Sequence, residues 1–223
     1  MKRKIILLSL CLISMVALAQ DRRALLDSLN VATDILGYHP DSLDLRLRKA
    51  SWNVELEQWQ YAKDEYDYVL RRDPQNVAAL FYRAFVNEKM HRYNFARRDY
   101  EAVLSMVPGN FESRLGLALL NQKDHHYTEA IDHINLLVSQ YPDSAVAYAA
   151  RGGMEVERGM LELAEYDFGK AISLAPCNTD YRLSRADVRL RLKRKDEARE
   201  DLDEMVKRGV SRANLADWYA KCR

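Results

Sequence analysis

The hydrophobic and small residues of this chain recur with a fixed period. The clearest marks are its five prolines, which stand 34 residues apart at Pro40, Pro74, Pro108, Pro142 and Pro176. A helix normally ends at or before the residue that precedes a proline, so the spacing predicts five evenly spaced helix ends. A constant period of this length indicates a repeat architecture.

Small residues occupy two further positions of the period. An alanine lies twelve residues before each of the last four prolines, and the series continues to position 198 (Ala62, Ala96, Ala130, Ala164 and Ala198). Another small residue lies twelve residues earlier in each case (Ala50, Ala84, Ala118, Gly152 and Ala186). Small side chains at two fixed positions let neighbouring helices approach closely, and a larger side chain would overpack the contact.

Large apolar residues follow the alanine of each period. Four residues later stand Tyr66, Tyr100, Ile134, Phe168 and Leu202, and three further on stand Val69, Val103, Leu137, Ala171 and Met205. Spacings of three and four place these residues on one helical face. Each period therefore predicts two antiparallel helices with a short turn between them, and Gly159 marks that turn in the fourth period.

This pattern resembles the tetratricopeptide repeat, or TPR, in five repeats: 43–76, 77–110, 111–144, 145–178 and 179–212. The resemblance implies an all-α fold, a right-handed α-solenoid of about five helix pairs. Two positions of the first helix depart from the family. Its early tryptophan is replaced by Arg46, Leu80, Arg114, Tyr148 and Arg182, and its usual large apolar residue by Asn53, Asn87, Asn121, Glu155 and Arg189.

The segments that flank the repeats predict one helix at each end. Residues 21–38 predict a lone helix with Ser28 in the small-residue position and the apolar stripe Leu25, Leu29, Ala32, Ile35 and Leu36. At the other end Gly209 favours a helix end and Ser211 a helix N-cap. Residues 212–222 then predict a capping helix with the apolar face Leu215, Trp218 and Tyr219. Such caps cover the apolar ends of a solenoid.

Charged residues add a second periodic feature. A basic residue at one repeat position is followed sixteen residues later by an acidic one, giving Lys49 with Glu65, Arg83 with Asp99, Arg151 with Asp167 and Arg185 with Asp201. The third repeat has Leu117 and His133 instead, so it lacks base and acid together. In a helix hairpin these positions lie side by side, which predicts four interhelical ion pairs. The alternative is a solvated charged face, whose exposed pairs contribute little.

The first residues, MKRKIILLSLCLISMVALAQ, fall outside the repeats. A basic start, an apolar stretch and the small residues before position 20 predict a signal peptide at 1–19, cleaved after Ala19, which leaves 20–223 as the TPR domain. We therefore expect an exported bacterial protein, either periplasmic, outer-membrane-associated or secreted, without a transmembrane helix in the mature chain. Leu10 before Cys11 argues against lipidation. Cys177 and Cys222 are too far apart in the repeats for a disulfide to be expected.

Candidate chemistry is sparse. His125, His126 and His133 lie near Glu129 and Asp132, but turn and repeat positions account for them, so we expect no metal. The basic run at 189–195 alternates with leucines and is followed by acidic residues. With 34 basic and 33 acidic residues in the chain, this run indicates a solvated helix face rather than a nucleic-acid site. Known phosphate-loop, nucleophile and zinc-protease motifs are missing from the sequence. We expect no cofactor and no enzymatic activity.

The TPR resemblance implies a concave groove lined by the first helix of each repeat. The matching positions hold Leu47 and Ser51, Phe81 and Phe85, Leu115 and Leu119, Ala149 and Gly153, and Leu183 and Asp187. The apolar ones among the first three repeats, with Tyr82 nearby, predict a partner-binding groove at Leu47, Phe81, Tyr82, Phe85, Leu115 and Leu119. The lysines and asparagines of a carboxylate clamp are missing there. The alternative is that these side chains pack only between repeats.

These observations favour a non-catalytic scaffold or adaptor of the bacterial cell envelope. We expect it to be monomeric alone and to bind a peptide or helix of another protein in the groove. One alternative is a structural subunit of a self-assembling or membrane-anchored envelope complex. Another is an accessory protein that binds glycan.

Overall fold

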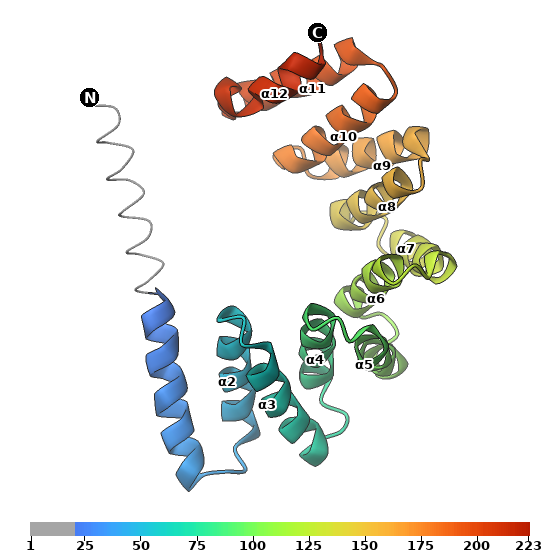
Figure 1. Ribbon diagram of the computed structural model, residues 1–223. Helices are drawn as coiled ribbons and strands as arrows, with labels where there is room; N and C mark the ends of the chain where they lie inside the picture. The colour runs from blue at the N-terminus through green and yellow to red at the C-terminus, as the bar shows by residue number, and fades with distance from the viewer. Residues whose placement is uncertain (1–20) are drawn as a thin grey trace, which may run out of the picture. The chain divides into compact units, whose positions relative to one another are not determined.

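The computed structural model in Figure 1 describes residues 21–223, and within that range the chain forms helices and no strand. The described chain divides into two compact halves, one ending at Gly109 and the other comprising Asn110–Arg223. The predicted signal peptide at 1–19 lies outside the described residues and stays a prediction.

The N-terminal half contains the first two helix pairs. Residues 21–38 are helical and are followed by α2 (Leu43–Glu55), α3 (Trp59–Arg72), α4 (Val77–Lys89) and α5 (Tyr93–Met106). Within this half α2 packs on α3, α3 on α4 and α4 on α5.

The C-terminal half contains three further pairs and a short terminal segment. Its elements are α6 (Phe111–Lys123), α7 (Tyr127–Gln140), α8 (Ala145–Glu157), α9 (Leu161–Leu174), α10 (Thr179–Arg191), α11 (Lys195–Lys207), the 3₁₀ helix η1 (Arg212–Leu215) and α12 (Ala216–Lys221). Each of these α-helices packs on the next along the chain (Figure 1). The all-α fold class predicted from the sequence, with two helices per period, is confirmed.

The ends of the helices follow from single residues at fixed repeat positions. Each second helix of the first four pairs stops two residues before a proline, as α3 does before Pro74. The next first helix then begins at a side-chain cap. The Asn76 Oδ1 atom accepts a hydrogen bond from the Ala79 amide at 2.9 Å, and Asn110, Ser144 and Asn178 cap α6, α8 and α10 in the same way.

The turn inside each pair requires one residue with a left-handed backbone. Positive φ angles of 58°, 57°, 62°, 74° and 62° occur 34 residues apart at Glu57, His91, His125, Gly159 and Lys193. A residue with a Cβ atom loses about 1–2 kcal/mol in this conformation, and glycine does not. Gly159 is therefore the favourable residue for this turn, and the other four repeats tolerate the strain.

The periodic small and apolar residues form the core. The ten small residues at the two fixed positions are all buried, and Tyr66, Ile134 and Leu202 on the neighbouring face are at most 1% exposed. Gly152 shows why small residues are needed: a Cβ atom there would lie 3.3 Å from the Phe168 Cζ atom and 3.4 Å from the Ala164 carbonyl oxygen. A longer side chain at position 152 would force the two helices apart.

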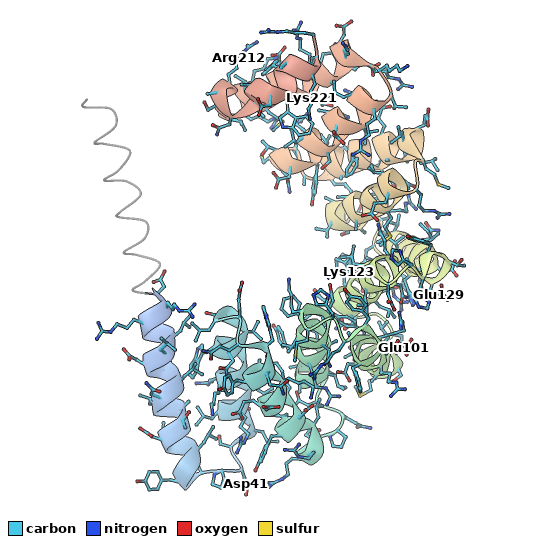
Figure 2. All side chains as sticks on the ribbon, in the orientation of Figure 1. Asp41, Glu101, Lys123, Glu129, Arg212 and Lys221 are labelled. Carbon is cyan, nitrogen blue, oxygen red and sulfur yellow. The ribbon has the colours of Figure 1, made fainter. Side chains whose placement is uncertain are left out.

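The N-terminal flank buries a narrower stripe than the sequence predicted. Leu29, Ala32 and Leu36 are buried, but Ile35 is 43% exposed, so its assignment to the stripe was wrong. Adjacent helical residues point about 100° apart, and Leu36 already faces inward. Asp41, labelled in Figure 2, lies between this helix and α2 and accepts hydrogen bonds from the Tyr68 hydroxyl at 2.9 Å and from Arg72.

The C-terminal flank caps the last pair with two short elements. The single helix predicted at 212–222 is instead η1 followed by α12, and the Ser211 side chain makes no capping hydrogen bond. Leu215 is 3% exposed at the junction and packs in one cluster with Leu202 and Met205 of α11. The segment thus enters α12 through one turn of the tighter 3₁₀ geometry, which is frequent at the N-termini of α-helices.

The four interhelical ion pairs predicted from the charge period are confirmed. The Lys49 Nζ atom lies 2.9 Å from Glu65, and the shortest N–O distances for Arg83–Asp99, Arg151–Asp167 and Arg185–Asp201 are 2.7, 2.6 and 2.5 Å. The three arginines donate through two nitrogens to both carboxylate oxygens. Their partner side chains are 8%, 1% and 2% exposed, so a solvated charged face was the wrong alternative.

Two of these arginines also bind the second helix of the preceding repeat. The Arg83 Nη1 atom donates to the Asp67 Oδ1 atom of α3 at 2.8 Å, and the Arg151 Nη1 atom donates to the Asn135 Oδ1 atom of α7 at 3.1 Å. Burial lowers the pKa of Arg83, but hydrogen bonds to Asp99 and Asp67 outweigh it and hold that pKa above its ordinary value. One guanidinium thereby links three helices.

We expect the Arg83–Asp99 pair to show strong energetic coupling. Arg83→Met leaves the buried Asp99 carboxylate without its partner and should lower the free energy of unfolding by about 3–5 kcal/mol. Adding Asp99→Leu to Arg83→Met should recover part of that loss. Urea denaturation of the wild type, both single variants and the double variant measures the coupling energy.

The half-exposed pair formed by Glu204 of α11 and Arg208, the residue after that helix, with 3.0 Å between the charged atoms, is the control for this cycle. The coupling energy of this control pair should be small, because solvent screens an exposed ion pair. A coupling for Arg83–Asp99 no larger than that of Glu204–Arg208 would contradict the structural role assigned to the buried pairs.

Candidate partner-binding surface

Two of the predicted groove residues, Phe81 and Phe85, lie one turn apart on α4. Both side chains are half-buried and pack against the core of the N-terminal half. The Phe85 ring meets Trp59 edge-on at 6.2 Å between centroids, and the Phe81 ring meets Tyr100 edge-on at 5.8 Å. The two phenylalanines therefore contribute to packing and also present part of their rings at the surface.

Tyr82 and Leu47 lie in the same half. Tyr82 is 47% exposed, and its ring stacks on the buried Tyr66 ring with centroids 6.2 Å apart. Leu47 of α2 is half-buried against the same core. Tyr82 and Phe81 also touch edge-on at 5.2 Å, so aromatic surface of α4 is continuous across these two residues.

The other two predicted groove residues lie on α6 in the C-terminal half. Leu115 is half-buried against the cluster that includes Ile134 and Leu137, and Leu119 is 45% exposed. α6 therefore has one face packed in the core and one face at the surface.

A cleft of about 480 Å³ lies in the C-terminal half between α8, α10 and α12. Three of its lining residues, Gly153, Leu183 and Asp187, occupy the groove positions that the sequence indicated for the fourth and fifth repeats. Its apolar lining comes mainly from Val156, Phe168, Leu183 and Trp218, and its polar lining from Glu157, Ser184, Asp187 and Arg191. The cleft thus combines an apolar surface with charged groups, as peptide-binding sites commonly do.

Trp218 is the cleft residue that the sequence reasoning missed. We assigned it only to the capping helix, but it also lines the cleft from α12 while packing against the last core cluster. The Lys221 ammonium lies 4.1 Å from the centroid of the Trp218 ring, and both Lys221 and Arg212 are labelled near the end of the chain in Figure 2. The sequence offered one signal for this role, which is a large aromatic residue in the capping element next to the last groove helix.

Neighbouring glycines of α8 have opposite environments. Gly152 packs against α9, whereas nothing lies within 4 Å of a Cβ atom built on Gly153. Because Gly153 lines the cleft, a side chain at this position would enter open space rather than the core.

The carboxyl group of Glu155 in α8 has an unusual environment. Glu155 is 8% exposed, and its Oε2 atom is buried without a hydrogen-bond partner in the described chain. Burial, followed by repulsion from the nearby Asp167 carboxylate, raises the pKa of Glu155 to about 7, against an opposing effect of Arg151. This is one of the polar positions that depart from the family pattern; Asn53, Asn87 and Asn121 occupy it in the first three repeats and are also buried.

The histidines and cysteines considered for metal or redox chemistry have the following environments. The His125 Nδ1 atom lies 2.7 Å from the Tyr127 hydroxyl, and His126 lies 3.5 Å from Asp124. Among residues 21–223 no three histidine, cysteine or acidic side chains are grouped to hold a metal. Cys177 is exposed and Cys222 buried, both as free thiols. Of the helices within residues 21–223, none combines the length and hydropathy that crossing a membrane requires.

Comparisons with known proteins agree with this geometry. Residues 87–145 match a family model described as tetratricopeptide repeat. No curated protein matches the chain. A TPR protein from Parabacteroides merdae has a similar solved structure, with 21% identity and a TM-score of 0.70 over 91% of this chain and 79% of that one.

Two further solved structures are similar over most of their length. A thermophilic TPR protein from Thermus thermophilus is 18% identical with a TM-score of 0.62, covering 81% of this chain and 98% of its own. YrrB, described as a TPR protein with an unusual peptide-binding site, is 17% identical with a TM-score of 0.57, covering 80% and 92%. At these identities the structures establish the fold. Together with the family match over residues 87–145 and the repeat pattern, they show that the chain has the tetratricopeptide repeat fold.

We expect the stability of this protein to depend on the protonation of Glu155. Folding raises the pKa of Glu155, so its protonated form stabilises the fold fully below about pH 4.5, and that contribution is lost as the pH rises through about 7. Glu155→Gln keeps the side chain neutral. The free energy of unfolding of Glu155→Gln, relative to that of the wild type, should therefore increase between about pH 5 and pH 8. At the upper end of this range the increase should reach about 1–3 kcal/mol.

Urea denaturation at several pH values measures this difference. Glu112→Gln, the same change at an exposed residue of α6, is the matched control and should shift stability by a similar small amount at every pH. A Glu155→Gln difference that does not vary with pH would contradict the assignment.

Proposed function

We propose that this protein is a non-catalytic adaptor of the bacterial cell envelope that binds a peptide or helix of another protein along the first helices of its repeats. The observation that carries the proposal is the cleft between α8, α10 and α12. Residues at the groove positions of two consecutive repeats line it, and Trp218 of the capping element lines it as well.

The chemistry of the cleft supports a protein ligand. A cleft of about 480 Å³ lined by Phe168, Leu183 and Trp218 can desolvate apolar side chains of a partner, and buried aromatic contacts of this kind dominate many interfaces. The Asp187–Arg191 ion pair at 2.8 Å places charge at the same cleft. Polar groups around an apolar centre are typical of protein interfaces.

The fold class supports the same conclusion at a coarser level. Helix-pair arrays present extended surfaces to proteins and peptides, and TPR proteins generally act as scaffolds without chemistry of their own. The comparison structure of YrrB is described as having a peptide-binding site. The envelope location rests on the signal-peptide pattern of residues 1–19.

Blocking the cleft should abolish partner binding without unfolding the protein. Gly153→Leu adds a side chain where a Cβ atom meets nothing within 4 Å, and it replaces a glycine in the interior of a helix, so the melting temperature should not fall. Proteins crosslinked to the wild type in its own cell envelope should be lost from the Gly153→Leu variant, as measured by quantitative pull-down.

Gly153→Ala is the matched control, because it makes the same helix-favouring change with only one methyl group in the cleft. It should retain the captured proteins. Partners that bind Gly153→Leu as well as wild type would place the binding surface elsewhere and contradict the groove assignment.

The envelope location makes a separate prediction. Protein isolated from its native cell should begin at Gln20, because the export machinery removes the signal peptide after Ala19. N-terminal sequencing of the protein in the cell-envelope fraction tests this. A chain that begins at Met1 in the soluble cytoplasmic fraction would overturn the proposed location and leave the cleft assignment to its own test.

A further inference from the structure

A second cleft, of about 620 Å³, lies in the N-terminal half. Residues of α3, α4 and α5 and of the turn before α5 line it, among them Lys63, Asn87, Arg92, Phe95 and Arg98. The predicted groove residues of this half do not line it. It is therefore a site separate from the one on which the proposed function rests.

Two cations of this cleft have no partner in the described chain. Arg83 is bound to Asp67 and Asp99, and Lys63 lies 2.6 Å from Asp67. By contrast, the exposed side chains of Arg92 and Arg98 make no hydrogen bond or ion pair with any residue of 21–223. The cleft thus holds two uncommitted guanidinium groups.

One residue that lines the same cleft, Asn87, holds a buried acceptor. Asn87 is 1% exposed, and its Oδ1 atom receives no hydrogen bond from the described chain. A buried amide oxygen without a donor is costly, and a ligand N–H group would satisfy it. Phe95 adds apolar surface at the edge of the cleft, since it is 58% exposed.

The equivalent residues three periods later show a carboxylate that this cleft lacks. Three periods after Lys63, Asn87 and Arg92 stand Glu165, Arg189 and Arg194. There the Glu165 carboxylate accepts hydrogen bonds from the Arg189 Nε atom at 2.8 Å and from the Arg194 Nη1 atom at 2.7 Å. The fourth repeat thus supplies a carboxylate to two arginines of the fifth repeat.

Between the first and second repeats that carboxylate is missing. Lys63 replaces the glutamate and is held by Asp67, while Asn87 replaces the arginine beside it. Arg92, the equivalent of Arg194, is left without an acid. The site is therefore built like an internal ion-pair cluster from which the anion has been removed.

We propose that this cleft binds an acidic side chain of a peptide segment from another protein. Arg92 and Arg98 donate hydrogen bonds to its carboxylate, the Asn87 Oδ1 atom accepts a peptide N–H, and Phe95 packs against the hydrocarbon part of the ligand. A carboxylate fits better than a phosphate, because Asp67 and Asp99 line the same cleft and repel a doubly charged anion more strongly.

The test uses a rhodamine-labelled peptide, Ala-Glu-Leu-Glu-Ala, capped at both ends, and its twin with glutamine in place of glutamate. Fluorescence polarisation with the purified protein should show saturable binding of the glutamate peptide and at least about tenfold weaker binding of the glutamine peptide. The double variant Arg92→Gln, Arg98→Gln should lose at least about tenfold in affinity for the glutamate peptide.

Two further variants separate the site from general charge and from folding. Arg48→Gln removes an exposed arginine of α2 outside the cleft and should bind within about twofold of wild type. Lys63→Glu with Asn87→Arg installs the fifth-repeat arrangement, in which the chain supplies its own carboxylate. This variant should keep its helical circular dichroism and lose at least about tenfold in affinity.

The proposal is overturned if the wild type shows no saturable binding, or if the glutamine peptide binds equally well. Equal losses in Arg48→Gln and in the Arg92, Arg98 double variant would also overturn it, because binding would then follow net charge. Binding to phosphatidylglycerol vesicles through Arg92 and Arg98, without peptide binding, would identify a lipid surface instead. Gly153→Leu should leave binding of the glutamate peptide unchanged, which keeps this test distinct from that of the proposed function.

Discussion

The buried ion pair between the two helices of a repeat is the interaction on which the rest of the structure depends. A carboxylate such as Asp167, at 1% exposure, is stable in the interior only with a partner that satisfies both of its oxygens. The arginine that does so lies on the first helix of the same repeat, and in two repeats it reaches the preceding second helix as well. The small residues at the helix contact allow this reach. The third repeat loses both members together and buries Leu117 instead, so no unpaired charge remains there.

One repeat position beside these pairs produces the local differences between repeats. Where the family usually has a large apolar residue, this chain has buried asparagines in three repeats, Glu155 in the fourth and Arg189 in the fifth. Arg189 binds Glu165 and Asp201 and completes a closed cluster. Glu155 has one buried oxygen unsatisfied, and burial together with repulsion from Asp167 raises its pKa to about 7. Asn87 leaves an open acceptor beside two uncommitted arginines. The same repeat position thus holds a fully paired group at Arg189, a titratable group at Glu155 and an unsatisfied acceptor at Asn87.

The two clefts differ in how far a sequence could reveal them. Gly153, Leu183 and Asp187 stood at groove positions because the repeat register assigns each residue to a face. Trp218 did not stand at such a position, since it belongs to the short helix α12 outside the repeat register. The cleft of the second repeat escaped the sequence reasoning altogether. Its residues come from three helices and the turn before α5. The missing carboxylate beside Arg92 becomes visible only when Glu165 is seen to bind the equivalent Arg194.

Periodicity by itself determined the helix pairs, the small residues at their contacts, the proline-terminated ends and the four ion pairs. These features depend on fixed separations along one chain, and a helix converts such separations directly into shared faces. Only the tertiary structure decided that Ile35 faces outward while Leu36 is buried, and that the last segment begins as the 3₁₀ helix η1. It also decided that the Glu155 Oε2 atom is buried without a donor. In each of these cases the outcome depends on how neighbouring elements share a limited interior. That competition for space and for hydrogen-bond partners involves residues whose separation along the chain does not follow the repeat.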